Sequence, residues 1–161
     1  MLTANDLNTL YEWARETKFP CKKAPTIDGY CNKVIDYYWL KSVKKSTIIR
    51  QKYMSDEVHK IYKNEDILFS NYTSFREGTE LYPHRDPDIL RYPYKRIQIP
   101  LHIPEVGKCT MRWIKGGTIV WEEGVPQVCN VMYDVHEASN LSDKDMFMMF
   151  LDVKMDTEVE L

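Results

Sequence analysis

Residues 96–103 read Arg-Ile-Gln-Ile-Pro-Leu-His-Ile, and this alternation with a period of two predicts a β-strand. One face of the strand carries only apolar side chains, those of Ile97, Ile99, Leu101 and Ile103. The opposite face carries Arg96, Gln98, Pro100 and His102. In an ordinary sandwich this second face would meet water, whereas in a barrel it would point inward and line a cavity. Alternation alone leaves both arrangements open.

Further short β-rich runs lie on either side of this strand, separated by turn signals. They cover residues 67–75, 109–114, 118–121, 127–133 and 146–153. Gly116-Gly117 predicts a hairpin turn between two of them, because glycine tolerates a positive φ. Many short strands with such turns favour an antiparallel sandwich or barrel from residue 67 onward.

The first 66 residues follow a different pattern. Leu7, Leu10, Tyr11 and Ala14 have the spacing of one buried helical face, and Asn5 can cap that helix. We interpret residues 32–63 as mostly helical. The expected architecture is one α+β domain with a helical layer over residues 1–66, a β core over 67–153 and an acidic tail over 154–161.

Composition and charge narrow the class of partner. The chain has 161 residues, of which 43% are hydrophobic and 29% charged, as in a folded globular protein. A net charge of −2 gives no general attraction to nucleic acid. The stretch between Lys41 and Lys63 holds seven cations and two anions, which we interpret as a solvated helix surface. A docking patch for an acidic partner is the alternative.

Cysteine spacing and hydropathy bear on location. No two of Cys21, Cys31, Cys109 and Cys129 have the Cys-x-x-Cys spacing of a thiolate metal site or redox motif. The sequence carries no signal peptide and no apolar stretch of membrane-spanning length. We expect a cytoplasmic protein with reduced thiols and no membrane partner.

The triplet His84-Arg85-Asp86 is the main chemical signal. Residues two apart in an extended chain project to the same side, so the imidazole of His84 and the carboxylate of Asp86 can bind one cation. Two histidines and one carboxylate on one face of an octahedron leave the other positions open, which is the geometry of non-haem Fe(II) oxygenases. His136, 50 residues after Asp86, is the expected third ligand. A surface turn between the flanking prolines is the alternative interpretation of the triplet.

Several ordered pieces of sequence surround this triplet. They are Glu77-Gly78-Thr79, Tyr82-Pro83-His84, the run from Arg96 to Pro104, Trp121-Glu122-Glu123-Gly124, His136-Glu137 and Phe150-Leu151-Asp152-Val153. In this order they make the chain from Thr73 to Val153 resemble the aspartyl/asparaginyl β-hydroxylase family of Fe(II)- and 2-oxoglutarate-dependent dioxygenases. The resemblance implies a double-stranded β-helix, a cupin-like jelly roll. From the sequence pattern of the first 66 residues we expect N-terminal helices to pack on one face of it.

The resemblance also implies roles for individual residues. His84 and His136 match the two metal histidines of the family. Asp86 stands where some members have the carboxylate ligand and others have glycine, so the triad is complete here. Arg96 and Thr73 match residues that line the pocket for 2-oxoglutarate.

Two positions depart from the family pattern. Gln98 stands where the family often has a histidine, although its amide can still donate a hydrogen bond. Met146 stands where the family has an arginine that pairs with the far carboxylate of 2-oxoglutarate. Methionine cannot make that pair, and a buried carboxylate without a cation is costly. We expect another cation to replace the arginine, in the order Arg96, Lys144 and Arg112.

The resemblance implies hydroxylation of an amino-acid-type substrate, an Asp, Asn or Pro side chain that is free or in a peptide or protein, with Fe(II) and 2-oxoglutarate as cofactors. We expect His102, Trp121 and Met146 to border the substrate pocket. A non-catalytic jelly roll that binds metal is the second function class, favoured by Met146. An oxygenase acting on nucleic acid is the third and weakest, because the basic stretch carries aromatic residues but no nucleic-acid motif.

Overall fold

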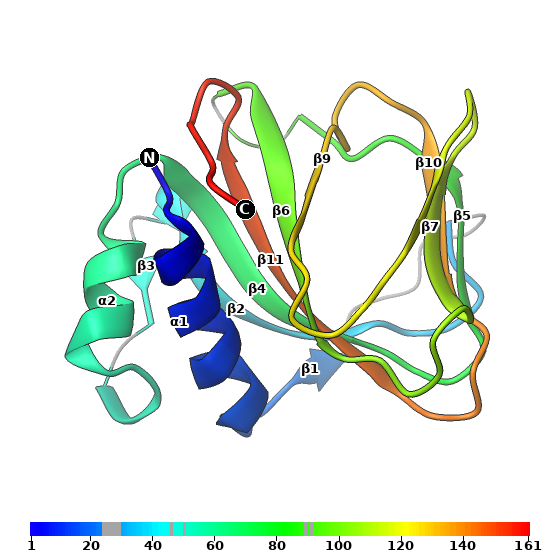
Figure 1. The fold of residues 1–161 in the computed structure, drawn as a ribbon, viewed down its shortest axis with the longest axis horizontal. Coiled ribbons are helices and arrows are strands. Elements are labelled where there is room, and N and C mark those ends of the chain that lie inside the picture. Colours follow the sequence, from blue (N-terminus) through cyan, green and yellow to red (C-terminus); the bar gives the residue numbers. More distant parts are fainter. Residues whose placement is uncertain (24–29, 46, 50, 89, 91) are drawn as a thin grey trace.

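Two antiparallel β-sheets face each other in the computed structural model, and two α-helices lie on the outer side of the larger sheet (Figure 1). The structure describes residues 1–23, 30–45, 47–49, 51–88, 90 and 92–161. The two-sheet arrangement with helices on one side agrees with the expected α+β jelly roll.

The described strands form one sheet of seven and one of four. The larger sheet has the order β1-β2-β4-β11-β6-β9, with β3 paired to β2. Its strands are β1 (Lys22–Lys23), β2 (Asp36–Ser42), β3 (Thr47–Ile48), β4 (Ile67–Phe75), β6 (Tyr94–His102), β9 (Gln127–Cys129) and β11 (Met146–Lys154). The smaller sheet has the order β5-β10-β7-β8. Its strands are β5 (Thr79–His84), β7 (Cys109–Trp113), β8 (Thr118–Val120) and β10 (His136–Asn140). The helices are α1 (Ala4–Glu16) and α2 (Asp56–Tyr62), with 3₁₀ turns η1 (Val43–Lys45) and η2 (Gln51–Tyr53).

The two faces of the larger sheet enter separate cores. On the outer face, Ile97, Ile99 and Leu101 of β6 pack in one buried cluster with Leu7 and Leu10 of α1. On the inner face, a second buried cluster fills part of the space between the sheets. The alternation predicted for residues 96–103 therefore separates helix-facing side chains from side chains that point between the sheets.

Ile103 departs from that alternation. The register between β11 and β6 shifts between Phe147 and Met148, opposite the end of β6 at His102. A shift of one residue moves the following side chain to the other face of a sheet. Ile103 consequently belongs to the inner cluster rather than to the outer one with Ile97.

Helix α1 confirms the predicted N-terminal helix but begins at a different cap. Thr3 accepts a hydrogen bond from the backbone N–H of Asp6 (3.1 Å), and the Asp6 carboxylate accepts one from the backbone N–H of Thr3 (3.0 Å). This reciprocal capping box satisfies two N–H groups, so Asn5 lies inside the first turn. Leu7, Leu10 and Ala14 are buried as the spacing predicts.

The helical interpretation of residues 32–63 is wrong for most of its length. Residues 36–42 form β2, which pairs with β4 from Asp36↔Ser74 to Ser42↔Phe69, and only α2 is an α-helix. Tyr37, Tyr38 and Trp39 suit a strand, since aromatic side chains pack well on a pleated surface. Backbone pairing with β4 from Phe69 to Ser74 outweighs an incidental helical spacing. The predicted helical layer over residues 1–66 is therefore a mixed one.

Strands β5 and β10 were not among the predicted β-runs, whereas β4 has the predicted bounds. Their sequences, Thr-Glu-Leu-Tyr-Pro-His and His-Glu-Ala-Ser-Asn, are short and polar and show no clear alternation. The predicted glycine turn is confirmed: Gly116 and Gly117 have φ of 124° and 106° between β7 and β8.

None of the helices in the described ranges is both long and apolar enough to cross a membrane.

Parts of the basic stretch (residues 41–63) and of the acidic tail (residues 154–161) are tied into the fold rather than lying on a solvated surface. Lys41 is buried, and its Nζ donates to the backbone carbonyls of Tyr62 (2.6 Å) and Asn64 (2.8 Å) at the end of α2. It therefore caps a helix rather than adding to a solvated basic surface. In the tail, Val159 forms a β-bridge with Leu2 and packs against the outer core, so this segment is tied to the fold.

Candidate metal centre

Two histidines far apart in sequence meet across one strand pair. His84 ends β5, His136 begins β10, and the antiparallel register places them directly opposite each other. Their ring centroids lie 4.5 Å apart. Strand pairing in the smaller sheet thus brings together the two residues predicted as metal ligands.

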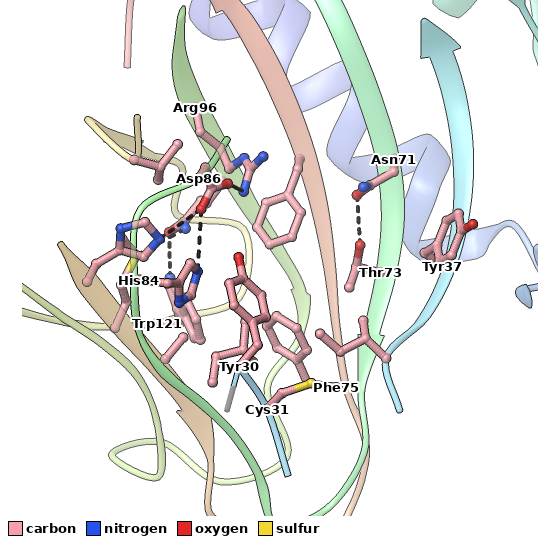
Figure 2. Close-up of a pocket in the computed structure, with 18 residues that line it drawn as sticks. Tyr30, Cys31, Tyr37, Asn71, Thr73, Phe75, His84, Asp86, Arg96 and Trp121 are labelled. Carbon is pink, nitrogen blue, oxygen red and sulfur yellow. Dashed lines mark hydrogen bonds and ion pairs between the residues drawn. The ribbon is translucent and has the colours of Figure 1, made fainter. Parts of the chain in front are cut away.

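Asp86 completes the group from the segment just beyond β5. Its backbone N–H donates to the carbonyl of Val131 (2.9 Å), which holds this segment against the chain that precedes β10. Its Oδ1 lies 3.4 Å from Nε2 of His84 and 3.1 Å from Nε2 of His136 (Figure 2). The three side chains are nearly closed off from solvent, with exposed fractions of 9% for His84, 9% for Asp86 and 5% for His136.

The contact that Nδ1 makes in each histidine shows which tautomer that ring adopts. Nδ1 of His84 lies 2.6 Å from the carbonyl oxygen of Tyr82, and Nδ1 of His136 lies 2.8 Å from that of Asp134. A carbonyl oxygen only accepts, so each Nδ1 carries the ring proton. In the neutral tautomer that this contact selects, Nε2 of each ring carries the lone pair and faces Oδ1 of Asp86. In that form the three residues offer three electron-pair donors to one cation.

The spacing of these donors fits a divalent cation. For metal–ligand bonds of about 2.1 Å, ligand atoms at right angles lie about 3 Å apart. The two Asp86 distances are close to this value, and the donor atoms of all three residues lie within 4.8 Å of one another. Two imidazoles and one carboxylate are the ligands of the Fe(II) facial triad. The residues fit that ion, and metal binding itself stays a prediction.

Arg96 joins the metal group to a second buried carboxylate. Its Nη1 lies 2.6 Å from Oδ2 of Asp86, and its Nε and Nη2 donate to Asp152 at 2.7 and 2.9 Å. Asp152 of β11 is the direct cross-strand neighbour of Arg96 on β6. Burial would lower the pKa of Arg96, but Asp152 and Asp86 raise it above its usual value. Burial would likewise raise the pKa of Asp86, but the charge of Arg96 together with the contacts to His136 and His84 outweighs this and holds the pKa of that carboxyl well below its usual range.

A cavity of about 250 Å³ opens beside the three donors, between the two sheets. Thr73, Arg96, Gln98 and Trp121 line it, as expected from the sequence. The indole Nε1 of Trp121 donates to Oε1 of Gln98 (2.9 Å), and Gln98 Nε2 contacts the sulfur of Met111 (3.2 Å). Arg96 and Gln98 thus occupy the cavity-lining face of β6. Their contact with a cosubstrate stays a prediction.

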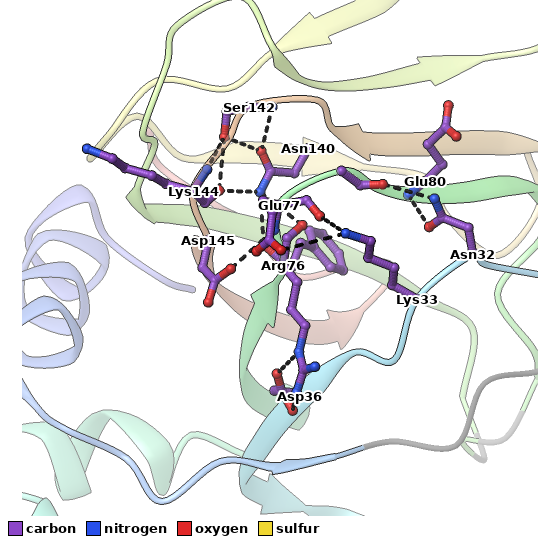
Figure 3. Close-up of polar contacts among 12 residues, drawn as sticks. Asn32, Lys33, Asp36, Arg76, Glu77, Glu80, Asn140, Ser142, Lys144 and Asp145 are labelled. Atoms are coloured by element: carbon purple, nitrogen blue, oxygen red, sulfur yellow. Dashed lines mark hydrogen bonds and ion pairs between the residues drawn. The ribbon is translucent and has the colours of Figure 1, made fainter.

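Four other predicted pocket residues lie elsewhere. Arg112 is 55% exposed and pairs with Glu137 at 2.6 Å, and Lys144 is an exposed turn residue. Figure 3 shows the amine of Lys144 directed away from the network in which its carbonyl accepts from Asn140. Met146 is buried in the inner core without lining the cavity. His102 is exposed and pairs with Glu123 (3.0 Å), on the other side of the larger sheet.

Sequence reasoning missed much of the cavity wall. Tyr30, Tyr37, Asn71 and Phe150 also line it, and Asp152 stands behind Arg96. The ring of Tyr30 lies 4.1 Å from that of His84, and burial together with the charge of Asp86 raises the pKa of its phenol. Alternation along residues 67–75 puts Asn71 on the same face as Thr73, so Asn71 alone had an available signal. The two tyrosines reach the cavity only through strand pairing.

Comparison with known proteins gives one family match. A family model described as aspartyl/asparaginyl β-hydroxylase matches residues 51–155, which is well over half of the chain. Among proteins with curated functions, none matches this sequence.

Solved structures share the fold at low sequence identity. An oxidoreductase of the 2OG-Fe(II) oxygenase family from Burkholderia pseudomallei aligns with a TM-score of 0.62 at 8% identity, covering 91% of this chain and 78% of that one. A cupin-2 domain from Rhodospirillum rubrum aligns with a TM-score of 0.54 at 7% identity, and the alignment covers 89% of this chain and 76% of that one. A cupin-like protein from Thermotoga maritima aligns with a TM-score of 0.53 at 11% identity, and the alignment covers 87% of this chain and 83% of that one. These similarities confirm the predicted cupin-like jelly roll.

Proposed function

Because this chain belongs to the aspartyl/asparaginyl β-hydroxylase family, we propose that it is an Fe(II)-dependent dioxygenase that hydroxylates an amino-acid-type substrate. The cosubstrate in this proposal is a 2-oxo acid, for which 2-oxoglutarate is the reference compound. The balanced reaction consumes one O₂ and one 2-oxo acid. It releases CO₂ and the acid one carbon shorter, and it leaves one new hydroxyl group on the substrate.

One observation carries the proposal. Nε2 of His84, Nε2 of His136 and Oδ1 of Asp86 converge on one point beside the cavity, while both Nδ1 atoms are already committed to backbone carbonyls. The donor set is open on the cavity side, so it supports a metal site with free positions rather than a closed structural one.

The protein's own groups have distinct tasks in this proposal. His84, Asp86 and His136 hold the metal, and Arg96 orients the Asp86 carboxylate through Oδ2 while Oδ1 faces the two imidazoles. When bound, Fe(II) and the 2-oxo acid supply the activation of oxygen. Apolar and aromatic side chains around the donors limit the access of water, which protects a reactive centre from side reactions.

The substrate class is proposed from the family and supported by the size of the cavity. A cavity of about 250 Å³ accommodates a cosubstrate and a single side chain rather than a bulky ligand. We therefore propose an Asp, Asn or Pro side chain, free or within a peptide or protein, as the group that is hydroxylated.

The test combines iron loading with product analysis. Protein loaded anaerobically with Fe(II) is given 2-oxoglutarate, a panel of amino acids and short peptides, and then oxygen. With the 2-oxo acid at a saturating concentration, we expect release of the acid one carbon shorter (succinate from 2-oxoglutarate), coupled to the gain of one oxygen atom by one member of the panel and detected by mass spectrometry. His136→Ala should abolish both signals, and His102→Ala, a histidine outside the cavity, should retain them. Tight iron binding without oxygen consumption would instead favour a non-catalytic metal-binding protein.

We also propose a reducing, cytoplasm-like location. All four cysteines are free thiols, and burial raises the pKa of Cys129 to about 12, which keeps it in the unreactive protonated form. Thiol counting on protein isolated from its native cells tests this: four reduced cysteines are expected, and a stable disulfide would contradict the proposal.

A further inference from the structure

The positive charge of the cavity is already balanced at its metal end. Within the part of the chain that the structure describes, Arg96 is the only lysine or arginine that lines the cavity. Its guanidinium donates twice to Asp152 and contacts Asp86 at 2.6 Å, so two carboxylates share this one cation. Phe150 covers one face of the guanidinium at 4.8 Å from the ring centroid. Arg96 is thus held in place by groups of the protein and has no charge left to balance a ligand.

The part of the cavity wall on the other side of β11 from Arg96 is polar but neutral. It is formed by Asn71 and Thr73 of β4 and Tyr37 of β2, the cross-strand neighbour of Thr73. Figure 2 shows Asn71 and Thr73 separated from Asp86 by the strand that lies between them. Thr73 Oγ1 donates to Oδ1 of Asn71 (2.7 Å), which leaves the amide nitrogen of Asn71 as a donor. This wall offers hydrogen bonds and no formal charge.

The formal charges of the site decide which ligand it suits. Asp86, Asp152 and Arg96 together carry one net negative charge, and a bound divalent cation changes this to one net positive charge. One carboxylate that chelates the metal brings the site to neutrality. A second carboxylate would lie against the neutral wall of Asn71, Thr73 and Tyr37 without a cation. A buried charge without a counter-charge is strongly unfavourable.

We propose that the cosubstrate of this site is a 2-oxo acid with one carboxylate and an uncharged far end, and not a dicarboxylic 2-oxo acid. The uncharged end accepts hydrogen bonds from Asn71 and Tyr37 or packs against Phe75 and Ile35. The inference rests on the proposed function, since it requires the metal to be chelated by a 2-oxo acid. It names the subclass of acid that this chain's own residues select.

Ligand binding to the wild-type protein tests this directly, without turnover. The protein is loaded anaerobically with Fe(II) and titrated with 2-oxoglutarate, with its 5-methyl ester and with 2-oxohexanoate. All three present the same chelating group, so the absorption band of the chelate reports each Kd on the same footing. We expect the ester and 2-oxohexanoate to bind at least about tenfold more tightly than 2-oxoglutarate. Thermal unfolding with each acid should give the same order.

A pair of variants at the far wall sharpens the test. Asn71→Lys places an ammonium group where the far carboxylate would lie, and we expect it to reverse the preference in favour of 2-oxoglutarate. Asn71→Gln keeps a neutral amide and should leave the preference as in the wild type. Far-ultraviolet circular dichroism establishes that both variants are folded. If Asn71→Lys does not fold, the comparison of acids on the wild-type protein decides alone.

The outcomes separate this inference from the proposed function. If 2-oxoglutarate binds as tightly as its ester, or more tightly, the neutral-end inference is overturned while an oxygenase dependent on a 2-oxo acid stands. If none of the three acids binds to the iron-loaded protein, the inference and the proposed function are both overturned. A tighter ester with a reversal in Asn71→Lys supports both.

Discussion

The two faces of the larger sheet use the same strands for different purposes. On β6, Ile97, Ile99 and Leu101 face the helices and are almost fully buried among apolar side chains. Arg96 and Gln98, which alternate with them, face the cavity and are held by Asp152 and Trp121. The outer face has aliphatic contacts that a helix layer covers, whereas the inner face has hydrogen bonds and charges that need exact partners. Substitutions on the two faces should therefore fail in different ways.

The largest expected effect is on the inner face, at Asp152. Asp152→Asn leaves Arg96 with one carboxylate in the described part of the chain, and breaking a buried ion pair costs roughly 3–5 kcal/mol. Metal affinity should also fall by roughly 10- to 100-fold, because the guanidinium then draws Asp86 away from the histidines. Urea unfolding and Co(II) titration measure the two effects. The matched control is Glu137→Gln, which removes a largely exposed pair with Arg112 and should cost under about 1 kcal/mol.

Ile97→Ala is the corresponding change on the outer face. Ile97 is fully buried between the sheet and the helices, so the cavity left behind should cost roughly 2–5 kcal/mol of unfolding free energy. Metal affinity should remain that of the wild type, because Ile97 faces the helices, on the side of the sheet away from the donors. A loss of metal affinity comparable to that of Asp152→Asn would contradict the separation of the two faces.

The two faces can also be compared through a pair of histidines. At a metal concentration of 100 times its Kd, binding to the folded state alone stabilises a protein by about 2.7 kcal/mol. His136→Ala should lose this stabilisation, because it removes one of three donors. His102→Ala should keep it, since His102 lies outside the cavity and pairs with Glu123. Thermal unfolding of both variants with and without Co(II) distinguishes them, and equal behaviour would argue against the assigned metal site.

A pH-dependent effect is expected at Lys41, a charged exception on the helix side. Burial lowers its pKa from 10.5 to about 8, so between these values the unfolded chain binds a proton that the folded chain has lost. Stability contributed by this group should therefore rise with pH from about 8 to about 10.5. Urea unfolding of wild type and Lys41→Met over this range isolates the contribution. Parallel pH profiles for the two proteins would exclude it.

Part of the fold and of the candidate site could be predicted from patterns among neighbouring residues. A β-rich run predicts β4, alternation predicts the faces of residues 96–101 of β6, and the triplet His84-Arg85-Asp86 predicts two of the three converging donors. These are local signals, because residues close together in sequence decide them.

Features created by pairing between distant segments were not predictable in the same way. Strands β5 and β10 are short and polar, so only their pairing with each other reveals them. Tyr30 reaches His84 because Cys31 bridges to Leu81, which no spacing in the sequence indicates. The prediction that Lys144 lies in the pocket is wrong for a related reason. Asn140 fixes the turn that precedes β11, and this turn directs the Lys144 side chain outward.

The indole of Trp121 gives the cavity an intrinsic optical reporter. It is only 1% exposed, donates its N–H to Gln98 and lies within the wall that a bound acid would touch. An indole shielded from water emits at short wavelength, and its emission responds to the polarity and the ions of its immediate surroundings. Occupation of this cavity should therefore change the part of the tryptophan emission that Trp121→Phe removes, measured against the remaining three tryptophans of the chain.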